Sequence, residues 1–387
     1  MSWQQLFMLE LKAIFSDRAL LLTVFGGVIF YSFLYPLPYS QQLPRDQQVV
    51  IVDLDSSALS RKLIRMVNAT PEVRVNRYVS SIGEAQQAIV EDGLAGMMVI
   101  PKHFYRDLLL NKTPTLSYAG DASYFLVYSK VAKGLATAGA TLAAEIKVLR
   151  DVAMGQALVA AKKQHTAIGL NLRPVFNTTT GYINYIVPAV FVLILHQTLL
   201  IGVGLLGGTQ NEKTLTGHPG YWINVPSWKL VFTRAFIFLL IYLVLSIYYF
   251  GFCFRFYGIS TLAKPLELIQ LIIPFILATG LVGICISQLL PRRELATLLV
   301  LLTSLPIVFS AGFVWPTNML PTPLLYASQL IPAIPGIQAF LQLNQMGAEF
   351  YQIRGLWLQL WLQVIVYGVI ASLLVGSKAN LKIVAQK

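Results

Sequence analysis

The sequence LATLLVLLTSLPIVFSAGFVWPTNMLP, residues 295–321, decides the fold of this chain. Its first part is apolar and of the length that crosses a bilayer core, which takes about 20 residues at about 1.5 Å each. Its second part, from Ser310, contains Gly312 and Pro316, residues that break a helix. Trp315, inside this break, is typical of a membrane interface. The stretch therefore predicts a membrane-spanning helix that ends in an interfacial turn.

The composition of the whole chain agrees with a membrane protein. Of the 387 residues, 56% are hydrophobic and 12% are charged, about half the charged fraction of a soluble domain. The net charge of +12 indicates basic residues retained in cytoplasmic loops, because no basic run with interleaved aromatic residues suggests nucleic-acid binding. Cys253 and Cys285 lie in or beside separate apolar segments and have no metal-binding spacing. We expect an α-helical integral membrane protein without a metal site.

Six apolar segments predict six transmembrane helices. The first covers residues 19–39 and follows an amphipathic segment, residues 1–18, that either lies on the membrane surface or packs against protein. The other five belong to a transmembrane domain of residues 179–387, at about 182–206, 230–250, 265–290, 295–312 and 356–376. Residues 313–355 are apolar but rich in proline, so we expect broken external or re-entrant helices there.

Residues 40–178 differ in character from the rest of the chain. They hold 16 of the 29 basic and 11 of the 17 acidic residues, which predicts a water-exposed domain. Strand-like runs alternate with helical patterns up to Tyr118, and one of these helices is expected to begin at Pro101. The alternation predicts a small inserted α/β sheet. Residues 122–168 contain no proline and predict one or two long helices that lead back to the membrane.

The short loops predict the orientation of the chain in the membrane. Alternate numbering of the connections places ten basic residues on one side: Lys12, Arg18, Lys213, Lys229, Arg234, Arg292, Arg293, Lys378, Lys382 and Lys387. The other side receives three, namely Arg255, Lys264 and Arg354. The large insert is left out, because large domains cross a membrane irrespective of charge. Both termini are therefore expected in the cytoplasm, and residues 40–178 outside it.

This layout resembles the membrane subunit of type-2 ABC exporters over nearly the whole chain. The most specific match is SAGFVWP at residues 310–316 with MLP at residues 319–321, which is similar to the family's turn after its fifth helix. IPAIPG at residues 331–336 looks like the proline-bearing helix that returns towards the sixth span. VIVDLD at residues 50–55 and GLAGMMVIP at residues 93–101 are similar to a bacterial subgroup with a large external domain between the first two helices.

The resemblance implies a permease of the bacterial inner membrane that exports a drug-like, lipid-linked or peptide substrate. It implies cytoplasmic ABC ATPase subunits as partners, a second copy or a homologous permease that completes a dimer, and a periplasmic adaptor as a further candidate partner. No Walker A pattern occurs in the chain. We therefore expect ATP and Mg²⁺ on the partner subunit, and neither a cofactor nor a catalytic residue on this chain.

The family's coupling helix, which docks on the ATPase, lies between the second and third spans. Here that position holds NEKTLTG, residues 211–217, which keeps the family's charges and Thr-Leu pair but moves the glycine. Glu212, Lys213, Thr214 and Leu215 are therefore candidates for coupling by position more than by motif. The alternative is a loop that is simply solvated.

The second span contributes candidates for the translocation path. His196 and Gln197 lie near its middle, and polar groups at that depth usually face a bundle interior or a cavity. The alternative is a hydrogen bond between helices. The turn after the fifth span is either an ordinary interfacial turn or the outer gate of the path. Its candidate gate residues are Ser310, Gly312, Phe313, Trp315 and Pro316.

The remaining polar residues are interpreted as structural. Arg234, near the inner end of the third span, is expected to extend its side chain to the interface, and Asp53 and Asp55 are expected to cap a turn or helix. Two other functions stay open. An ion-coupled secondary transporter would need carboxylates within the spans, where only Glu267 is available. A non-transporting membrane scaffold or receptor would be built around the external domain.

Overall fold

The computed structural model of the protein describes residues 1–39, 44–164, 173–178, 180–218 and 220–385, with side chains up to Ser377. Lys387 and residues 40 and 179, which begin two of the predicted domains, lie outside the described residues, as do the side chains of Lys378 and Lys382. The chain divides into two compact units. Unit 1 is Met1–Gln42 with Pro174–Lys387, and unit 2 is Leu43–Arg173.

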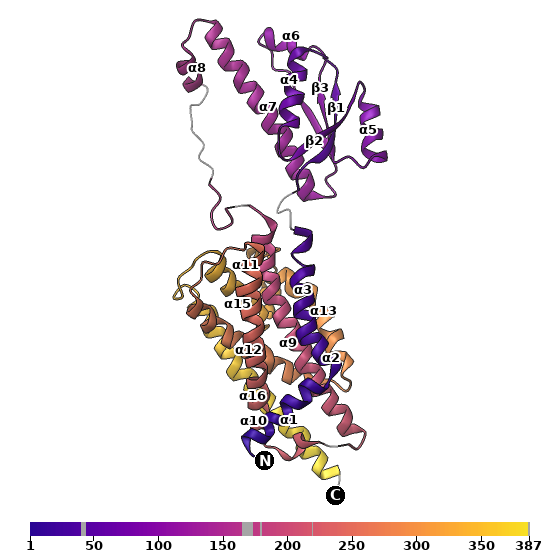
Figure 1. The fold of residues 1–387 in the computed structure, drawn as a ribbon, viewed down its shortest axis with the longest axis vertical. Coiled ribbons are helices and arrows are strands. Elements are labelled where there is room, and N and C mark those ends of the chain that lie inside the picture. Colours follow the sequence, from indigo (N-terminus) through magenta and orange to yellow (C-terminus); the bar gives the residue numbers. More distant parts are fainter. Residues whose placement is uncertain (40–43, 165–172, 179, 219, 386–387) are drawn as a thin grey trace. The chain divides into compact units, whose positions relative to one another are not determined.

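Unit 2 is built on a four-stranded sheet with the order β2-β1-β3-β4 (Figure 1). The first three strands are parallel, and β4 runs antiparallel to β3. The strands are β1 (Gln47–Asp53), β2 (Val73–Val79), β3 (Gly96–Ile100) and β4 (Ser117–Gly120). The helices are α4 (Ala58–Asn68), α5 (Ile82–Glu91), α6 (Phe104–Leu109), α7 (Phe125–Ala153) and α8 (Leu158–Gln164). The predicted small sheet is therefore present.

The central strand β1 is covered on both faces, which is usual for parallel strands. Val49 and Ile51 pack against α4 and α7, whereas Val50 and Val52 pack against α5. Figure 1 shows α5 on the other side of the sheet from α4 and α7. Successive side chains of a strand point to opposite faces, so four consecutive apolar residues can serve two cores.

Two local predictions in unit 2 had different outcomes. The capping roles of Asp53 and Asp55 are confirmed: Asp53 Oδ1 accepts the N–H groups of Asp55 and Ser56, and Asp55 Oδ2 accepts that of Tyr105 in the first turn of α6. The helix start at Pro101 is wrong. The helix begins at Phe104, because His103 takes the left-handed conformation with φ 63° directly before it.

Unit 1 is a bundle of apolar helices. It opens with α1 (Trp3–Ser16), followed by α2 (Arg18–Leu21), the π-helical η1 (Leu22–Gly27), α3 (Val28–Leu34) and η2 (Leu37–Tyr39). The bundle continues with α9 (Tyr182–Leu215), η3 (Tyr221–Asn224), α10 (Ser227–Ile247), η4 (Tyr248–Cys253), α11 (Phe254–Tyr257) and α12 (Pro265–Leu289). It ends with α13 (Glu294–Ser310), η5 (Thr317–Met319), α14 (Thr322–Ser328), α15 (Ala333–Phe340), η6 (Leu341–Gln345) and α16 (Arg354–Ala385).

Five helical segments of the described residues are long and apolar enough to cross a membrane. They are Arg18–Tyr39, Tyr182–Leu215, Ser227–Tyr257, Pro265–Leu289 and Arg354–Ser377. The pair Thr322–Ser328 and Ala333–Gln345 meets the same test but bends by 88°, so it is a broken span or a re-entrant loop. Helix α13 has 17 residues and is about 26 Å long, slightly less than the roughly 30 Å of a bilayer core. The chain is therefore a multi-pass membrane protein with five or six spans by this measure.

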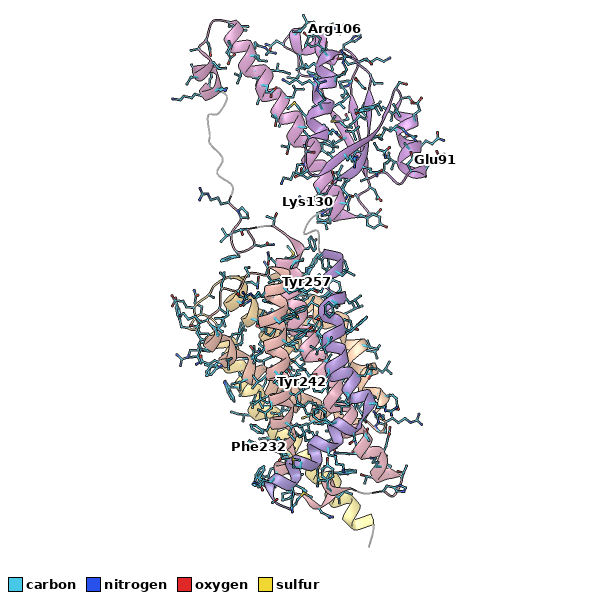
Figure 2. The ribbon with its side chains drawn as sticks, viewed as in Figure 1. Glu91, Arg106, Lys130, Phe232, Tyr242 and Tyr257 are labelled. Carbon is cyan, nitrogen blue, oxygen red and sulfur yellow. The ribbon has the colours of Figure 1, made fainter. Side chains whose placement is uncertain are left out.

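Helix α9 forms the centre of the bundle, since 89% of an apolar 18-residue stretch of this helix is buried inside the protein. Neighbouring helices hold it through polar contacts as well; Tyr242 of α10, labelled in Figure 2, donates to Thr198 Oγ1 at 3.0 Å. The helix continues beyond residue 206, the predicted end of this span, to Leu215. Its 34 residues measure about 51 Å, so the helix exceeds the thickness of a bilayer core.

Candidate functional site

A buried ion pair joins the first helix to the third span. Arg234 of α10 donates from Nε to Glu10 Oε2 at 2.8 Å and from Nη2 to Glu10 Oε1 at 2.7 Å. The two side chains are 1% and 0% exposed. Buried charges are tolerated when they are paired and hydrogen-bonded in this two-point geometry. The prediction that Arg234 extends to the interface is wrong, because a carboxylate of α1 meets its guanidinium inside the protein.

The same contact decides how α1 is placed. Leu6, Glu10 and Ile14, spaced four residues apart, are all fully buried, and Ser2 and Gln5 form a capping box at the start of the helix. One face of α1 therefore packs against protein, which was one of the two predicted alternatives. The opposite side still exposes Met8, an apolar residue.

Two further side chains complete what we call the inner network, made of Glu10, Gln210, Tyr221 and Arg234. Gln210 of α9 accepts from Arg234 Nη2 at 2.7 Å, and the Tyr221 hydroxyl donates to Glu10 Oε1 at 2.8 Å. Burial, together with the neighbouring Glu10 carboxylate, raises the pKa of Tyr221, so its hydroxyl stays a proton donor at neutral pH. The consecutive segments α9, η3 and α10 thus meet α1 at one point, although Glu10 is 200 or more residues away from the other three members.

A second set of contacts, the turn network, joins the end of α9 to the connection between α12 and α13. Glu212 Oε1 accepts the backbone N–H of Arg293 at 2.7 Å, and the Arg293 guanidinium pairs with Asp17 at 2.9 Å. Asn211 Nδ2 donates to the carbonyls of Ser287 and Leu290 at 2.7 and 3.2 Å, where α12 ends. The last two turns of α9 are therefore attached on both sides.

The carboxylate of Asp17 is stabilised in its charged form. Partial burial alone would raise its pKa, but hydrogen bonds from Arg293 and from the backbone N–H groups of Leu20 and Ala19 outweigh burial, and the pKa of Asp17 is lowered. Asp17 also caps the first helix of the first span through these two N–H groups. One side chain thus connects the start of this span to the α12–α13 turn.

Glycines allow this end of α9 to approach its neighbours closely. A Cβ at Gly208 would lie 2.6 Å from the Arg293 Cα, and a Cβ at Gly207 would overlap the Ser287 side chain. Arg293 is a member of the turn network, and the carbonyl of Ser287 accepts a hydrogen bond from Asn211. The absence of side chains at these two positions is therefore what brings Glu212 and Asn211 within hydrogen-bonding distance of the turn.

The four predicted coupling residues divide into two pairs. Glu212 belongs to the turn network, and Thr214 Oγ1 accepts a hydrogen bond from Trp222 Nε1 at 3.1 Å. Lys213 and Leu215 are exposed, and Leu215 is 70% accessible. They lie in the last turn of α9 rather than in a loop. The exposed pair is available to a partner, and the other pair connects to the protein interior.

The two predicted path residues of α9 have different surroundings. Gln197 Nε2 donates to Ser304 Oγ of α13 at 2.8 Å, a hydrogen bond between helices. His196 is fully buried and stacks on Phe275 of α12 with 6.5 Å between ring centroids. Neither of its ring nitrogens has a hydrogen-bond partner within the described part of the chain.

The turn after α13 holds the predicted gate residues at the opposite end of α9. Ser310 and Phe313 are buried, whereas Gly312, Trp315 and Pro316 are exposed. Gly312 has φ +89°, and a Cβ there would lie 2.8 Å from Thr317 Cγ2. The hydroxyl of Tyr185, in the first turn of α9, donates to the Phe313 carbonyl. The gate and coupling candidates are therefore not one cluster but lie near the two ends of one helix.

Sequence reasoning missed Glu10, Gln210 and Tyr221 as members of a site. A signal was nevertheless present. Glu10 is the single acidic residue in an apolar stripe of four-residue spacing, and Arg234 is the single basic residue of the predicted third span, residues 230–250. Two isolated opposite charges in apolar segments indicate an ion pair, because each charge needs a partner when it is buried.

Comparison with known proteins agrees with this architecture. A family model described as ABC-2 family transporter protein matches residues 18–373. The chain belongs to the ABC-2 transporter family. Members of this family are typically non-catalytic membrane subunits that associate with ABC ATPase subunits. A search of curated proteins finds no match to the chain. The family match begins after α1, so Glu10 precedes it although its partner Arg234 lies within it.

Proposed function

We propose that this chain is the transmembrane permease subunit of an ATP-driven ABC exporter. The observation that carries the proposal is the double attachment of the end of α9, through Gln210 to α1 and α10 and through Glu212 to the α12–α13 turn. A displacement of this end would move several helices together, because each attachment includes a hydrogen bond with a charged group, worth about 1.5–3 kcal/mol.

In this proposal, separate ABC ATPase subunits hold ATP and Mg²⁺ and push on the end of α9. Lys213 and Leu215, which are exposed, would form the contact with the ATPase. Glu212 and Thr214 would pass the displacement to the α12–α13 turn and to η3, with which they are hydrogen-bonded. A helix that extends beyond the membrane suits this role, since it transmits force without an intervening flexible loop.

The proposed translocation path follows α9 and α13. Two contacts support the pairing of these helices, Gln197 with Ser304 and Tyr185 with the turn after α13. Gln197 lines the path beside Ser304, whereas His196 is buried against α12 next to it. The residues of that turn form the outer gate: Ser310, Gly312, Phe313, Trp315 and Pro316. A second copy or a homologous permease supplies the opposite wall. The exported substrate is a drug-like, lipid-linked or peptide molecule.

The proposed orientation places the coupling end of α9 in the cytoplasm of a bacterial cell and the chain in its inner membrane. The distribution of basic residues supports this orientation: without Arg234, which is buried in α10, nine remain on one side and three on the other. Both termini would then be cytoplasmic, and residues 40–178 extracytoplasmic. Helix α1 begins at Trp3 and shares the inner network with Gln210, so the N-terminal helix lies at the same end of the bundle as the coupling residues.

ATPase activity tests this proposal directly. A complex purified through this chain and placed in lipid nanodiscs should hydrolyse ATP in a vanadate-sensitive manner. Lys213→Glu should lower the amount of co-purified ATPase, whereas Arg255→Glu, the same charge change in the exposed end of α11, should not. A secondary transporter or a non-transporting scaffold would give no vanadate-sensitive hydrolysis, and this result would contradict the exporter assignment.

We also propose a periplasmic adaptor as a partner of unit 2. The segment where α7 passes into α8 exposes several apolar side chains, which are Leu149, Met154, Leu158 and Val159. Exposed apolar side chains in such a group mark interaction surfaces. Photo-crosslinking from position 154 in intact cells should capture an envelope protein, and the same probe at position 90 on α5 serves as a control.

A further inference from the structure

Unit 2 contains a cavity with polar and apolar walls that none of the foregoing roles uses. The cavity has a volume of about 620 Å³ and lies beside the carboxyl ends of β1 and β2. Its walls come from four neighbouring segments, the turn after β1, the helix α4, the end of β2 and the start of α5. Open α/β sheets bind their ligands outside the carboxyl ends of the strands. This cavity lies at that edge of the sheet, beside β1 and β2 rather than between β1 and β3, where the strand order reverses.

Two arginines of α4 define the charge of the cavity. Arg61 and Arg65 are four residues apart and so lie on the same face of the helix. Arg61 Nη1 donates to the carbonyl of Ser56 at 2.9 Å, which positions its guanidinium at the cavity. Arg65 is exposed, and its guanidinium has no hydrogen bond or ion pair to the described residues. One guanidinium is thus held in place, and the other is free to bind an anion.

The carboxylates of the cavity are already engaged elsewhere. Asp53 accepts from the N–H groups of Asp55 and Ser56, and its second oxygen accepts from Ser60 Oγ at 2.7 Å. Glu84 lies in the first turn of α5, where its carboxylate accepts the N–H of Ser80 at 3.3 Å. Because these acids satisfy backbone donors and helix ends, they do not form ion pairs with the two arginines.

The remaining wall of the cavity is apolar. Ile64 of α4 and Val79 of β2 line it, and the ring of Tyr78 is 61% exposed beside them. An exposed aromatic ring next to two guanidinium groups, one held in place and one free, suits a ligand that has both an apolar or aromatic part and a negative charge.

We propose that this cavity binds an organic anion. A phosphate or carboxylate group binds between Arg61 and Arg65, where planar guanidinium groups can donate two parallel hydrogen bonds. The apolar or aromatic body of the same molecule packs on Tyr78 and Ile64. The site goes beyond the exporter proposal, because binding to unit 2 needs neither the ATPase nor a translocation path.

Calorimetric titration of the full chain in phosphatidylcholine nanodiscs tests the site. Phenyl phosphate is the probe, phenol is the analogue without the anion, and inorganic phosphate is the analogue without the apolar body. We expect phenyl phosphate to bind at least about tenfold more tightly than either analogue, since both halves of the site contribute. Equal binding of phenol and phenyl phosphate would overturn the proposal.

Three variants locate the binding. Arg65→Gln should weaken phenyl phosphate binding at least about tenfold, the loss expected for a charge-assisted hydrogen bond. Arg74→Gln, an equal charge change on the exposed side of β2 outside the cavity, should leave binding unchanged. Tyr78→Ala should weaken phenyl phosphate more than inorganic phosphate. Equal losses in the Arg65 and Arg74 variants would mean that binding is nonspecific and would overturn the assignment.

A competition experiment distinguishes two kinds of phosphate ligand, a lipid headgroup and a small free anion. Soluble dihexanoyl phosphatidate should displace phenyl phosphate if the cavity accepts a lipid headgroup. Phenyl phosphate binding that is undisturbed by this lipid would support a small free anion as the ligand. Both results support the site, whereas the ATPase measurements test the exporter proposal independently of it.

Discussion

Arg234 holds Glu10 through two hydrogen bonds of 2.8 and 2.7 Å, although the two residues are 224 positions apart in the chain. This contact connects the helix before the first span to the third span. With Gln210 it also includes the end of the central helix α9. The inner network therefore joins the end of α9 to the middle of α1 and to the first half of α10.

Removal of one partner of this pair should destabilise the protein. Glu10→Gln leaves the buried Arg234 guanidinium without a neutralising charge, which costs about 3–5 kcal/mol. Thermal unfolding of the purified chain should therefore begin at a clearly lower temperature than in the wild type. The double variant Glu10→Leu with Arg234→Met should recover much of the loss, because neither charge remains. Equal unfolding temperatures of the single variant and the wild type would contradict the pairing.

The exposed end of α9 should affect partner binding without affecting stability. Leu215→Glu places a charge on a side chain that is 70% accessible, so unfolding should change by no more than about 0.5 kcal/mol. Co-purified ATPase should nevertheless decrease if Leu215 contacts that partner. Leu289→Glu, a matched change at an exposed leucine at the end of α12, serves as the control. Loss of stability in the Leu215 variant would show a structural role instead.

Gly312 should not tolerate a side chain. Its φ of +89° and the close Thr317 methyl group make Gly312→Ala strained by about 1–3 kcal/mol. We expect normal membrane insertion but slower export, measured as substrate efflux from vesicles. Gly280→Ala is the matched control, because a Cβ at that helical glycine meets no atom within 4 Å. Normal efflux by the Gly312 variant would argue against a gate in this turn.

Asp17 should make stability depend on pH in the acidic range only. Its pKa is lowered in the folded protein from the usual 3.8, so its contribution is complete above the unfolded pKa and is lost as pH falls through the folded pKa. Asp17→Asn should therefore destabilise the protein at pH 7 and at pH 5 by a similar amount. The difference from the wild type should shrink below pH 3.8. A difference that is unchanged at pH 2 would refute the role of the carboxylate.

The apolar spans and the small sheet could be predicted because their signals are local. A run of apolar residues such as those of α12 encodes a helix within its own length, and β1 shows its strand character in four consecutive apolar residues. Sequence reasoning ended the second span at residue 206, whereas α9 reaches Leu215, because packing by Gly207 and Gly208 keeps the following polar residues helical.

The polar networks could not be predicted because they depend on register between distant segments. In the sequence, Gln210 belongs to a polar connection between two spans. Its contacts with Arg234 and Glu10 appear only in the folded protein. Arg293 was recognised as a loop cation, yet its use by Glu212 and Asp17 follows only from the packing of α9 on the α12–α13 turn. The sequence thus showed which residues are charged, but only the tertiary fold showed which residues they contact.

The capping box at Ser2 and the carboxylate of Glu10 have a practical consequence for recombinant work. An expression clone trimmed to begin at Arg18, where the family match starts, would leave the Arg234 guanidinium buried in the protein with no counter-ion. Such a truncated product should aggregate or be degraded after synthesis. An affinity tag is better fused with a spacer upstream of Met1, so that the first turn of α1 can still form.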